Sequence, residues 1–393
     1  MQEVFVVSAV RTAIGSFGGS LKDVQASQLA STAVAASIQR AGVAPEQVLH
    51  LAMGHVIPSE PRDAYLSRIA ALESGLPKEI AAFNVNRLCG SGLQASIAAA
   101  QSLMRGDAQI AVGAGAESMS RGAYLMTAAR WGIRMGDAAL YDFTTGVLHD
   151  PFGRMHMGVT AENVAERFGV TREEQDELAV ESHRRAIAAC EAGRFVEQIV
   201  PVEIKDRKGT KLFEADEHMR ADTTLDTLAK MKPVFRRDGG TVTAGNSSGI
   251  NDGAAALTLA SGDAVRRDAL KPLARLVGYA HAGVEPGLMG IGPVPATKAV
   301  LARTGLAVRD LDVIEANEAF AAQACAVMRE LELDPAKVNP NGSGISLGHP
   351  IGATGAIIAV KAIHELHRIG GRYALVTMCI GGGQGIAAIF ERV

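Results

Sequence analysis

Short apolar runs rich in β-branched residues alternate with amphipathic segments of helical length through most of this 393-residue chain. The first run, at residues 4–7, predicts a buried strand. A helix that ends near Gly106 is predicted by four apolar residues spaced along one face: Leu93, Ile97, Ala100 and Leu103. Strands that alternate with helices are typical of parallel sheets with crossover helices, so the pattern predicts an α/β protein.

The same order of elements occurs twice, which predicts an internal duplication. In the first half, a strand at 83–87 leads through CGSG into the helix just described, followed by a strand at 109–112 and a glycine-rich turn, GAGAES. In the second half, GHPIGATG opens a helix that ends near Gly370, followed by a strand at 373–378 and the turn GGGQG. Two such halves packed together often share one site at their junction.

The middle of the chain is far more polar than its flanks. Charged residues number 31 among the 80 residues from 161 to 240, against 50 among the other 313. A segment this charged exposes more surface, so we expect an inserted subdomain here. Its clearest helix begins with a capping box, Thr171 and Glu174, and runs to about Glu191, before Gly193.

Composition narrows the function classes. The chain is 48% hydrophobic and 21% charged, with a net charge of −3, so it lacks the basic surface that nucleic-acid binding requires. Residues 373–390 are uncharged, but GGGQG interrupts them, so we expect no membrane span. The N-terminus does not resemble a secretory signal, and four scattered cysteines form no CxxC pair. These features predict a soluble protein of the reducing cytoplasm.

Cys89 is the first candidate for chemistry, because it ends a predicted strand and begins a helix, next to Gly90 and Gly92. Helix N-termini stabilise thiolates, so this position predicts a lowered thiol pKa and a reactive nucleophile. The alternative is a small, inert, buried residue, which is the common fate of free cysteines.

Three further residues lie where a predicted strand gives way to a helix or a glycine turn. His349 precedes a helix, where we expect it to stay neutral and accept a proton. Cys379 precedes a run of glycines whose N–H groups are free to face an oxyanion. Asn317 follows a strand at 311–315, and its amide either donates to an oxygen or water or caps a helix.

Other patterns in the sequence compete with this interpretation. GNSSG, with Ser247 at its centre, has the form of a hydrolase nucleophile elbow, but the strand before it is very short; the residues after it, NDGAAAL, suit a helix. Neither GAGAES nor GGGQG completes a dinucleotide-binding motif. Cys190 and Cys325 lie in helical patterns, and we expect both to pack.

Seven motifs in order resemble the thiolases: NRLCGSG, GAGAESMS, HMGVTAENVA, GTVTAGNSSGINDGAAA, EANEAFAAQA, NPNGSGISLGHPIGATG and TMCIGGGQG. Among thiolases, the chain resembles bacterial acetyl-CoA acetyltransferases, including the broad-range β-ketothiolases. Residues 60–63, EPRD, are similar to a segment found in those β-ketothiolases. The resemblance implies a duplicated, five-layered αβαβα fold that assembles as a homotetramer. The implied divisions are an N-terminal half (1–119 plus 251–271), a loop domain (120–250) and a C-terminal half (272–393).

The resemblance also implies a function, the reversible condensation of acetyl-CoA with a short acyl-CoA and the thiolysis of 3-ketoacyl-CoA. Cys89 would carry the acyl group, His349 would activate it and Cys379 would move the α-proton. Asn317 would hold a water that, with His349, stabilises the enolate. The N–H groups of Gly381 and Cys89 would form the second oxyanion hole.

Coenzyme A is implied as a substrate rather than a resident cofactor, and no metal is expected. The family's coenzyme A contacts match seven positions here: His156, Met157, Arg220, Phe235, Ala244, Ser248 and Phe320. Acyl length would depend on side chains near Leu88, Met157 and Met289.

Three other functions remain as alternatives at this point. A hydrolase would use Ser247. A decarboxylating condensing enzyme would need only one reactive cysteine, so Cys379 argues against it. A non-enzymatic acyl-CoA carrier would not need an intact set of reactive residues.

Overall fold

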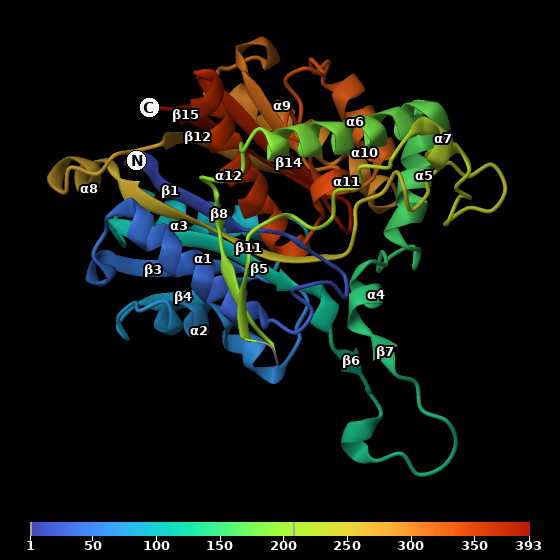
Figure 1. Ribbon diagram of the computed structural model, residues 1–393, viewed down its shortest axis with the longest axis horizontal. Helices are drawn as coiled ribbons and strands as arrows, with labels where there is room; N and C mark the ends of the chain where they lie inside the picture. Colours follow the sequence, from blue (N-terminus) through green and yellow to red (C-terminus); the bar gives the residue numbers. More distant parts are fainter. Residues whose placement is uncertain (1, 207–208) are drawn as a thin grey trace.

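The computed structural model describes residues 2–206 and 209–393. Within them, eleven strands form one mixed sheet, in the order β13-β14-β15-β12-β1-β11-β5-β3-β4, with β2 and β8 attached to it (Figure 1). The strands of the first half are β1 (Val4–Thr12), β2 (Gly15–Ser16), β3 (Val48–Gly54), β4 (Ala81–Val85), β5 (Ile110–Ser118) and β11 (Asn251–Ser261). Strand β8 (Ile199–Val200) comes from the segment between β5 and β11. Those of the second half are β12 (Ala274–Gly283), β13 (Val313–Ala316), β14 (Tyr373–Ile380) and β15 (Gln384–Arg392).

The strand order confirms the predicted duplication. The run β3-β5-β11-β1 is repeated as β13-β14-β15-β12, with a parallel pair followed by two antiparallel pairs in each. The two runs join between β1 and β12, where only Phe5 with Arg275 and Val6 with Ala274 are paired. Each half therefore contributes its own run of strands, and a short seam joins the two runs into one sheet.

Helices lie on both sides of each half-sheet, as the predicted αβαβα fold requires (Figure 1). The outer helices are α1 (Ala26–Ala41) and α2 (Leu66–Glu73) in the first half, and α9 (Pro293–Thr304) and α10 (Ala321–Glu330) in the second. Between the half-sheets lie α3 (Ser91–Arg105) and α12 (Ile351–Ile369), which end at Gly106 and Gly370 as predicted. Both central helices pack into one apolar core with strands of both halves. Their N-termini place the two candidate loops, CGSG and GHPIG, in the same layer.

GAGAES is not the predicted turn, because β5 continues through it to Ser118. Its glycines are needed for close packing instead. A Cβ on Gly113 would overlap the backbone of Ser96 in α3, and one on Gly115 would lie 2.5 Å from the carbonyl oxygen of Gly352 in α12. Glycine here lets two helix backbones rest directly on the strand.

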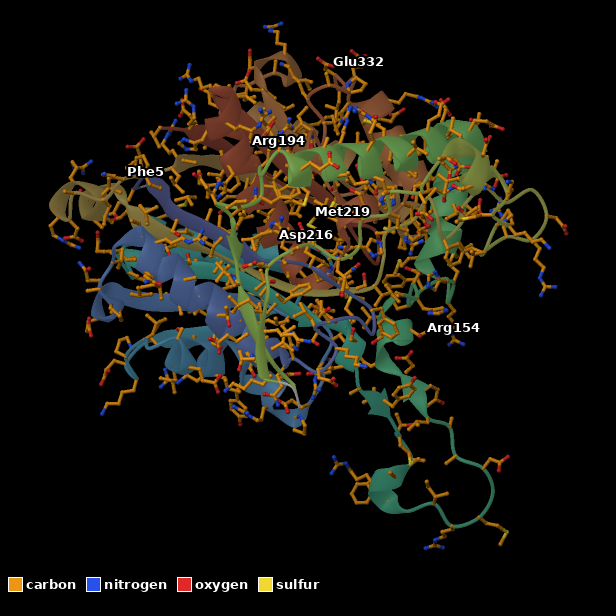
Figure 2. The ribbon with its side chains drawn as sticks, viewed as in Figure 1. Phe5, Arg154, Arg194, Asp216, Met219 and Glu332 are labelled. Carbon is orange, nitrogen blue, oxygen red and sulfur yellow. The ribbon has the colours of Figure 1, made fainter. Side chains whose placement is uncertain are left out.

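The segment from 120 to 250 contains most of the irregular structure. Its elements are β6 (Tyr124–Leu125), β7 (Tyr141–Asp142), α4 (Phe143–Val147), α5 (Met157–Phe168), α6 (Arg172–Glu191), β9 (Val202–Asp206), β10 (Gly209–Phe213) and α7 (Leu225–Ala229). The remaining short helices are α8 (Gly262–Arg267) and α11 (Gly344–Leu347). The arm between β6 and β7 projects from the body, and its side chains stand apart from the rest of the chain (Figures 1 and 2).

Helix α6 begins and ends as the sequence predicts. Thr171 Oγ1 accepts from the Glu174 N–H, and Glu174 Oε2 accepts from the Thr171 N–H, which is a complete capping box. The prediction that Cys190 packs is wrong, because this residue lies on the exposed face of α6, whereas Cys325 in α10 is partly buried as expected. Among the described residues, no helix has both the length and the apolar content to cross a bilayer.

Candidate active site

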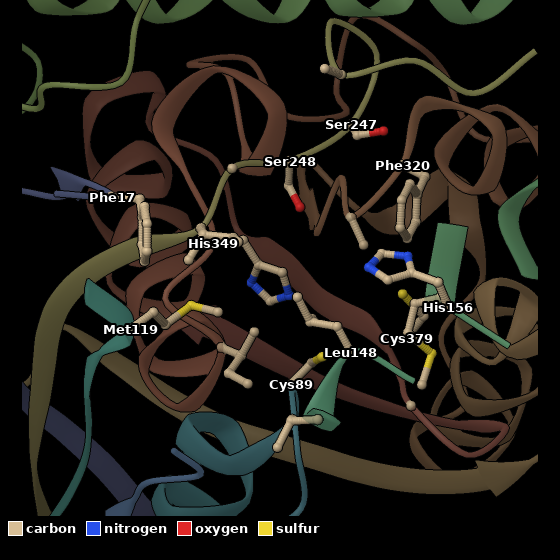
Figure 3. Close-up of a pocket in the computed structure, with 18 of the residues that line it drawn as sticks. Phe17, Cys89, Met119, Leu148, His156, Ser247, Ser248, Phe320, His349 and Cys379 are labelled. Carbon is tan, nitrogen blue, oxygen red and sulfur yellow. The ribbon is translucent and has the colours of Figure 1, made fainter. Parts of the chain in front are cut away.

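A cavity of about 600 Å³ opens between the N-termini of the two central helices and the 120–250 segment. Figure 3 shows Cys89, His349 and Cys379 on its walls. Eleven of the twelve residues singled out from the sequence line it: Cys89, His349, Cys379, Gly381, His156, Met157, Arg220, Phe235, Ala244, Ser248 and Phe320. The twelfth, Asn317, is buried and touches His349 instead. The fold thus brings together residues that are up to 292 positions apart in the sequence.

Cys89 lies in a tight connection between β4 and α3. Leu88, immediately before it, has a φ of +46°, a left-handed conformation that non-glycine residues rarely adopt. Ser91 stabilises this turn, since its hydroxyl accepts from the Arg87 N–H at 2.8 Å and donates to the Leu88 carbonyl at 2.6 Å. The strained turn directs Cys89 into the cavity rather than along the helix.

The expectation of a lowered Cys89 pKa is wrong. Burial raises the pKa of the thiol to about 11, although the N–H groups of Gly381 and of Cys89 itself act to lower it. The nearby Glu117 carboxylate raises it further. The helix N-terminus therefore does not ionise Cys89 by itself, and the thiol needs a base when it reacts.

His349 is held as a neutral base. Its Nδ1 lies 2.6 Å from the hydroxyl oxygen of Thr354, and that hydroxyl donates its one proton to the Pro350 carbonyl at 2.9 Å. The Thr354 oxygen must then accept from His349 Nδ1–H, which leaves Nε2 without a proton. Burial lowers the pKa of His349 to about 4. The expected neutral state follows from burial rather than from the helix dipole.

The backbone around His349 is fixed by Asn251. The side-chain oxygen of Asn251 accepts from the His349 N–H at 2.9 Å, and its amide donates to the Gly15 carbonyl at 3.0 Å. Gly348 has a φ of +104°, and a Cβ there would overlap the Asn251 side chain. The loop before α12 is thus tied to the end of β11 in the other half of the molecule.

Asn317 follows β13 and presents its amide to His349. Its Nδ2 lies 3.4 Å from His349 Nε2, and its backbone N–H donates to the Thr377 carbonyl at 3.0 Å. Helix α10 begins only at Ala321, so Asn317 does not cap it. Within the described residues, Asn317 Oδ1 is buried without a partner, which leaves it free to bind a water or a substrate atom.

Cys379 lies near the end of β14, and Gly381 begins the turn into β15. Burial and the neighbouring Cys89 both raise the pKa of the Cys379 thiol. Gly382 and Gly383 adopt φ values of +79° and +82°, which make the tight turn possible. The Gly381 N–H points at Cys89, and a Cβ at Gly381 would lie 3.1 Å from the methyl carbon of Met157.

Three of the residues matched to coenzyme A contacts, His156, Phe235 and Phe320, pack together in the cavity wall. His156 caps α5 by accepting from the Gly158 N–H at 3.0 Å, and its ring stacks on Phe235 with centroids 4.6 Å apart. Phe235 in turn meets the edge of Phe320 at 6.3 Å. Figure 3 shows His156 and Phe320 on one side of the cavity and Phe17 and Met119 on the other.

Ser247 lies in the cavity wall but lacks the geometry of a nucleophile elbow. Its hydroxyl donates to the Thr243 carbonyl at 2.7 Å. The residues after it form strand β11 rather than the expected helix, and the residues before it form no strand. Ser247 therefore does not lie on the sharp turn between a strand and a helix that a hydrolase nucleophile elbow requires.

Sequence analysis missed several residues that the fold places here. Thr354 and Asn251 orient His349, and Phe17, Leu148 and His218 line the cavity. Only Thr354 carries a local signal, because it lies five residues after His349 in the first turn of a predicted helix. Leu88, Met157 and Met289 line the cavity, as supposed.

Comparisons with known proteins give one answer. A family model for the N-terminal domain of thiolases matches residues 4–263, and one for the C-terminal domain matches residues 270–392. The chain is 64% identical to the β-ketothiolase BktB of Cupriavidus necator and 48% identical to an acetyl-CoA acetyltransferase of that organism, in both cases with 100% of both chains covered. A crystal structure of human mitochondrial 3-ketoacyl-CoA thiolase in complex with CoA superimposes with a TM-score of 0.97 at 44% identity, covering 100% of this chain and 98% of that chain.

Proposed function

This chain belongs to the thiolase family, and from that premise we propose that it is an acetyl-CoA C-acetyltransferase. In one direction it joins acetyl-CoA to acetyl-CoA or another short acyl-CoA, and in the other it cleaves 3-ketoacyl-CoA with coenzyme A. One observation carries the proposal: two cysteines and a histidine with an unprotonated Nε2 meet in one cavity. A hydrolase or a one-cysteine condensing enzyme has no use for Cys379.

The first half-reaction loads Cys89. His349 Nε2 takes the thiol proton, and the sulfur attacks the thioester carbonyl of acetyl-CoA. The N–H groups of Gly381 and Cys89 stabilise the oxyanion, each such donor being worth roughly 2.7–4 kcal/mol. Coenzyme A leaves as a thiolate and takes the proton of Cys379, whose raised pKa keeps it protonated until then. Acetyl-Cys89, protonated His349 and a Cys379 thiolate remain.

The second half-reaction forms the carbon–carbon bond. The Cys379 thiolate removes a proton from the methyl group of a second acetyl-CoA. Protonated His349 and a water held by Asn317 stabilise the enolate oxygen. The enolate carbon attacks acetyl-Cys89, the Cys89 sulfur leaves, and it recovers its proton from His349. Cys379 is protonated again, so all three groups return to their starting states.

Coenzyme A would bind along the wall formed by the 120–250 segment. Met157, Phe235 and Phe320 offer apolar and aromatic surface to the pantetheine arm, and the Arg220 guanidinium suits a phosphate. Ser248 and Ala244 allow close approach beside the aromatic residues. The chain needs no resident cofactor for these steps, because every proton is carried by Cys89, His349 or Cys379.

Assembly as a homotetramer is part of the proposal. The arm between β6 and β7 exposes apolar side chains that a soluble monomer normally buries, including Trp131 at 89% and Met135 at 96% exposure. Strand β4 ends the sheet, with Phe83 exposed, and offers a second surface for pairing. We place the enzyme in the cytoplasm, where reducing conditions keep Cys89 and Cys379 as thiols.

Trapping the acylated enzyme tests this function. Wild-type protein is mixed with [1-14C]acetyl-CoA, quenched in acid and digested, and the label is expected on the peptide that contains Cys89. A Cys89→Ala variant gives the background. Label on another residue, or turnover without labelled Cys89, would refute the proposed route.

A further inference from the structure

Glu117, near the end of β5, is a buried carboxylate that joins three segments of the chain. Its Oε2 accepts from the Gly352 N–H at 2.8 Å in the first turn of α12. It also accepts from the Ile57 N–H at 3.0 Å and from the Val56 N–H at 3.2 Å, just after β3. His55 Nδ1 lies 3.0 Å from Glu117 Oε1. All of these partners are donors, so the site is built around an ionised carboxylate.

The cluster of Glu117 and His55 lies against the backbone segments that carry Cys89 and His349. Gly352 is three residues after His349, and a Cβ there would overlap Glu117 Oε2 and lie 3.1 Å from the Cα of His55. A Cβ on Gly54 would lie 2.6 Å from both the Gly352 carbonyl oxygen and the Gly92 nitrogen. Gly92 lies in the first turn of α3, three residues after Cys89. A shift of Glu117 would therefore also displace the N-termini of α3 and α12.

His55 carries the positive charge of the cluster and lies between two carboxylates, Glu117 and Asp63. Burial acts to lower the pKa of His55, but Glu117 and, more weakly, Asp63 outweigh it and raise the value to about 9, so His55 is cationic at neutral pH. Asp63, in the 3-10 helix η2 (Pro61–Tyr65), lies 3.8 Å from His55 Nε2. Among charged side chains, Glu117 raises the pKa of Cys89, and Cys89 in turn raises the pKa of Cys379. His55 is therefore the counter-charge to the one carboxylate that opposes ionisation of Cys89.

We propose that Glu117 and His55 are positioning residues for the thiolase reaction: Glu117 holds the first turn of α12, and thus His349, in place, while His55 neutralises the charge that Glu117 would otherwise impose on Cys89. The inference rests on the proposed function, because it concerns the same nucleophile and base. Neither residue lines the cavity or touches the reacting atoms. Their influence passes through the Gly352 backbone and through the electrostatic field at Cys89.

Three variants separate this role from simple stabilisation. His55→Asn keeps a donor near Glu117 but removes the positive charge, Glu117→Gln keeps an acceptor for Gly352 but removes the negative charge, and the double variant removes both. Two quantities are measured: the pH dependence of iodoacetamide alkylation of Cys89, read by mass spectrometry of its peptide, and kcat and KM for acetyl-CoA. Circular dichroism and thermal melting confirm that each variant is folded.

We expect the alkylation profile of His55→Asn to move to higher pH by about one unit, the lower end of the shift that a nearby charge causes. Its kcat should fall by about tenfold, with KM changed less than about twofold, because the coenzyme A wall is untouched. In the double variant, the alkylation profile should return to within about 0.3 units of wild type, since the Glu117 charge that His55 opposes is gone as well.

Glu391→Gln serves as the matched control, because it removes a paired carboxylate, bound to Arg275 and Arg372, far along β15. It should leave the profile and kcat unchanged. An unshifted profile in His55→Asn, or a double variant displaced as far as His55→Asn, would overturn the inference. Failure of wild-type Cys89 to take up acetyl label would instead overturn the proposed function, which keeps the two results distinguishable.

Discussion

The hydroxyl of Thr354 lies 2.6 Å from Nδ1 of His349 and fixes which ring nitrogen carries the proton. The hydroxyl proton is already donated to Pro350, so Nδ1 must donate and Nε2 carries no proton. A buried threonine in the first turn of α12 thus gives His349 the tautomer that its proposed role as a base requires.

Thr354→Val should lower kcat by roughly tenfold to a hundredfold, because valine has the same shape but accepts no hydrogen bond from His349, and loss of such an orienting partner commonly has effects of this size. The KM for acetyl-CoA should change little. Thr354→Ser keeps the hydroxyl and should recover most of the activity. Steady-state thiolysis assays on the two variants decide the matter, and equal loss in both would argue against tautomer control.

Cys379→Ala should separate the two half-reactions. Acetyl loading of Cys89 should still go to completion, because coenzyme A is able to leave as an unprotonated thiolate. Condensation and thiolysis should both disappear, since no group remains to take or return the α-proton. Rapid quench with labelled acetyl-CoA measures the first process, and product analysis measures the second. A variant that cannot load would contradict this division of labour between the cysteines.

Ser247→Ala should leave the rate of thiolysis within about twofold of wild type. The Ser247 hydroxyl donates to a backbone carbonyl, and substitutions outside the core usually have small effects. Iodoacetamide should abolish activity in both proteins. Prior incubation with acetyl-CoA should protect them by acylating Cys89. Loss of activity in Ser247→Ala, together with resistance to alkylation, would instead support a serine hydrolase.

Folding stability should decrease as the pH falls from about 6.5 to about 4. Burial lowers the folded-state pKa of His349 to about 4, so in this range the unfolded chain takes up a proton that the folded chain does not. The stability is complete above pH 6.5, and His349 accounts for a loss of up to about 3 kcal/mol below it. His183 and His218, whose pKa values burial also lowers to about 4, act in the same direction.

Urea unfolding at pH 7, 6 and 5 measures this dependence. His349→Asn should show a shallower decline than wild type, because it lacks one of the histidines whose folded-state pKa burial lowers. An equal slope in both proteins would show that His349 is not buried in its neutral form.

The sequence predicted most of what local signals determine. Gly106 and Gly370 end helices, Thr171 and Glu174 cap one, and Cys89 and His349 precede the two central helices, all because a few neighbouring residues decide these features. The roles of the reactive residues came from the order of motifs, and they stay predictions until the variants are made.

Other predictions were wrong where distant segments decide the result. The glycines of GAGAES suit a turn or a close helix contact equally well, and only α3 and α12 show which applies. The alanines of NDGAAAL suit a helix, but β11 is buried on both faces and needs small residues there. Cys89 has a raised rather than a lowered pKa, because enclosure by segments remote in sequence outweighs the adjacent helix terminus.

The contact between Gly54, Gly92 and Gly352 limits which positions near the active site can change during evolution. The proposed nucleophile, Cys89, and the proposed base, His349, come from different halves of the chain. Backbone atoms set their spacing at this contact, so no side-chain substitution there adjusts the spacing gradually. Changes in acyl-group specificity would instead arise in the cavity lining, at residues such as Met289 and Leu148. There the side chains can vary in size without moving the reacting atoms.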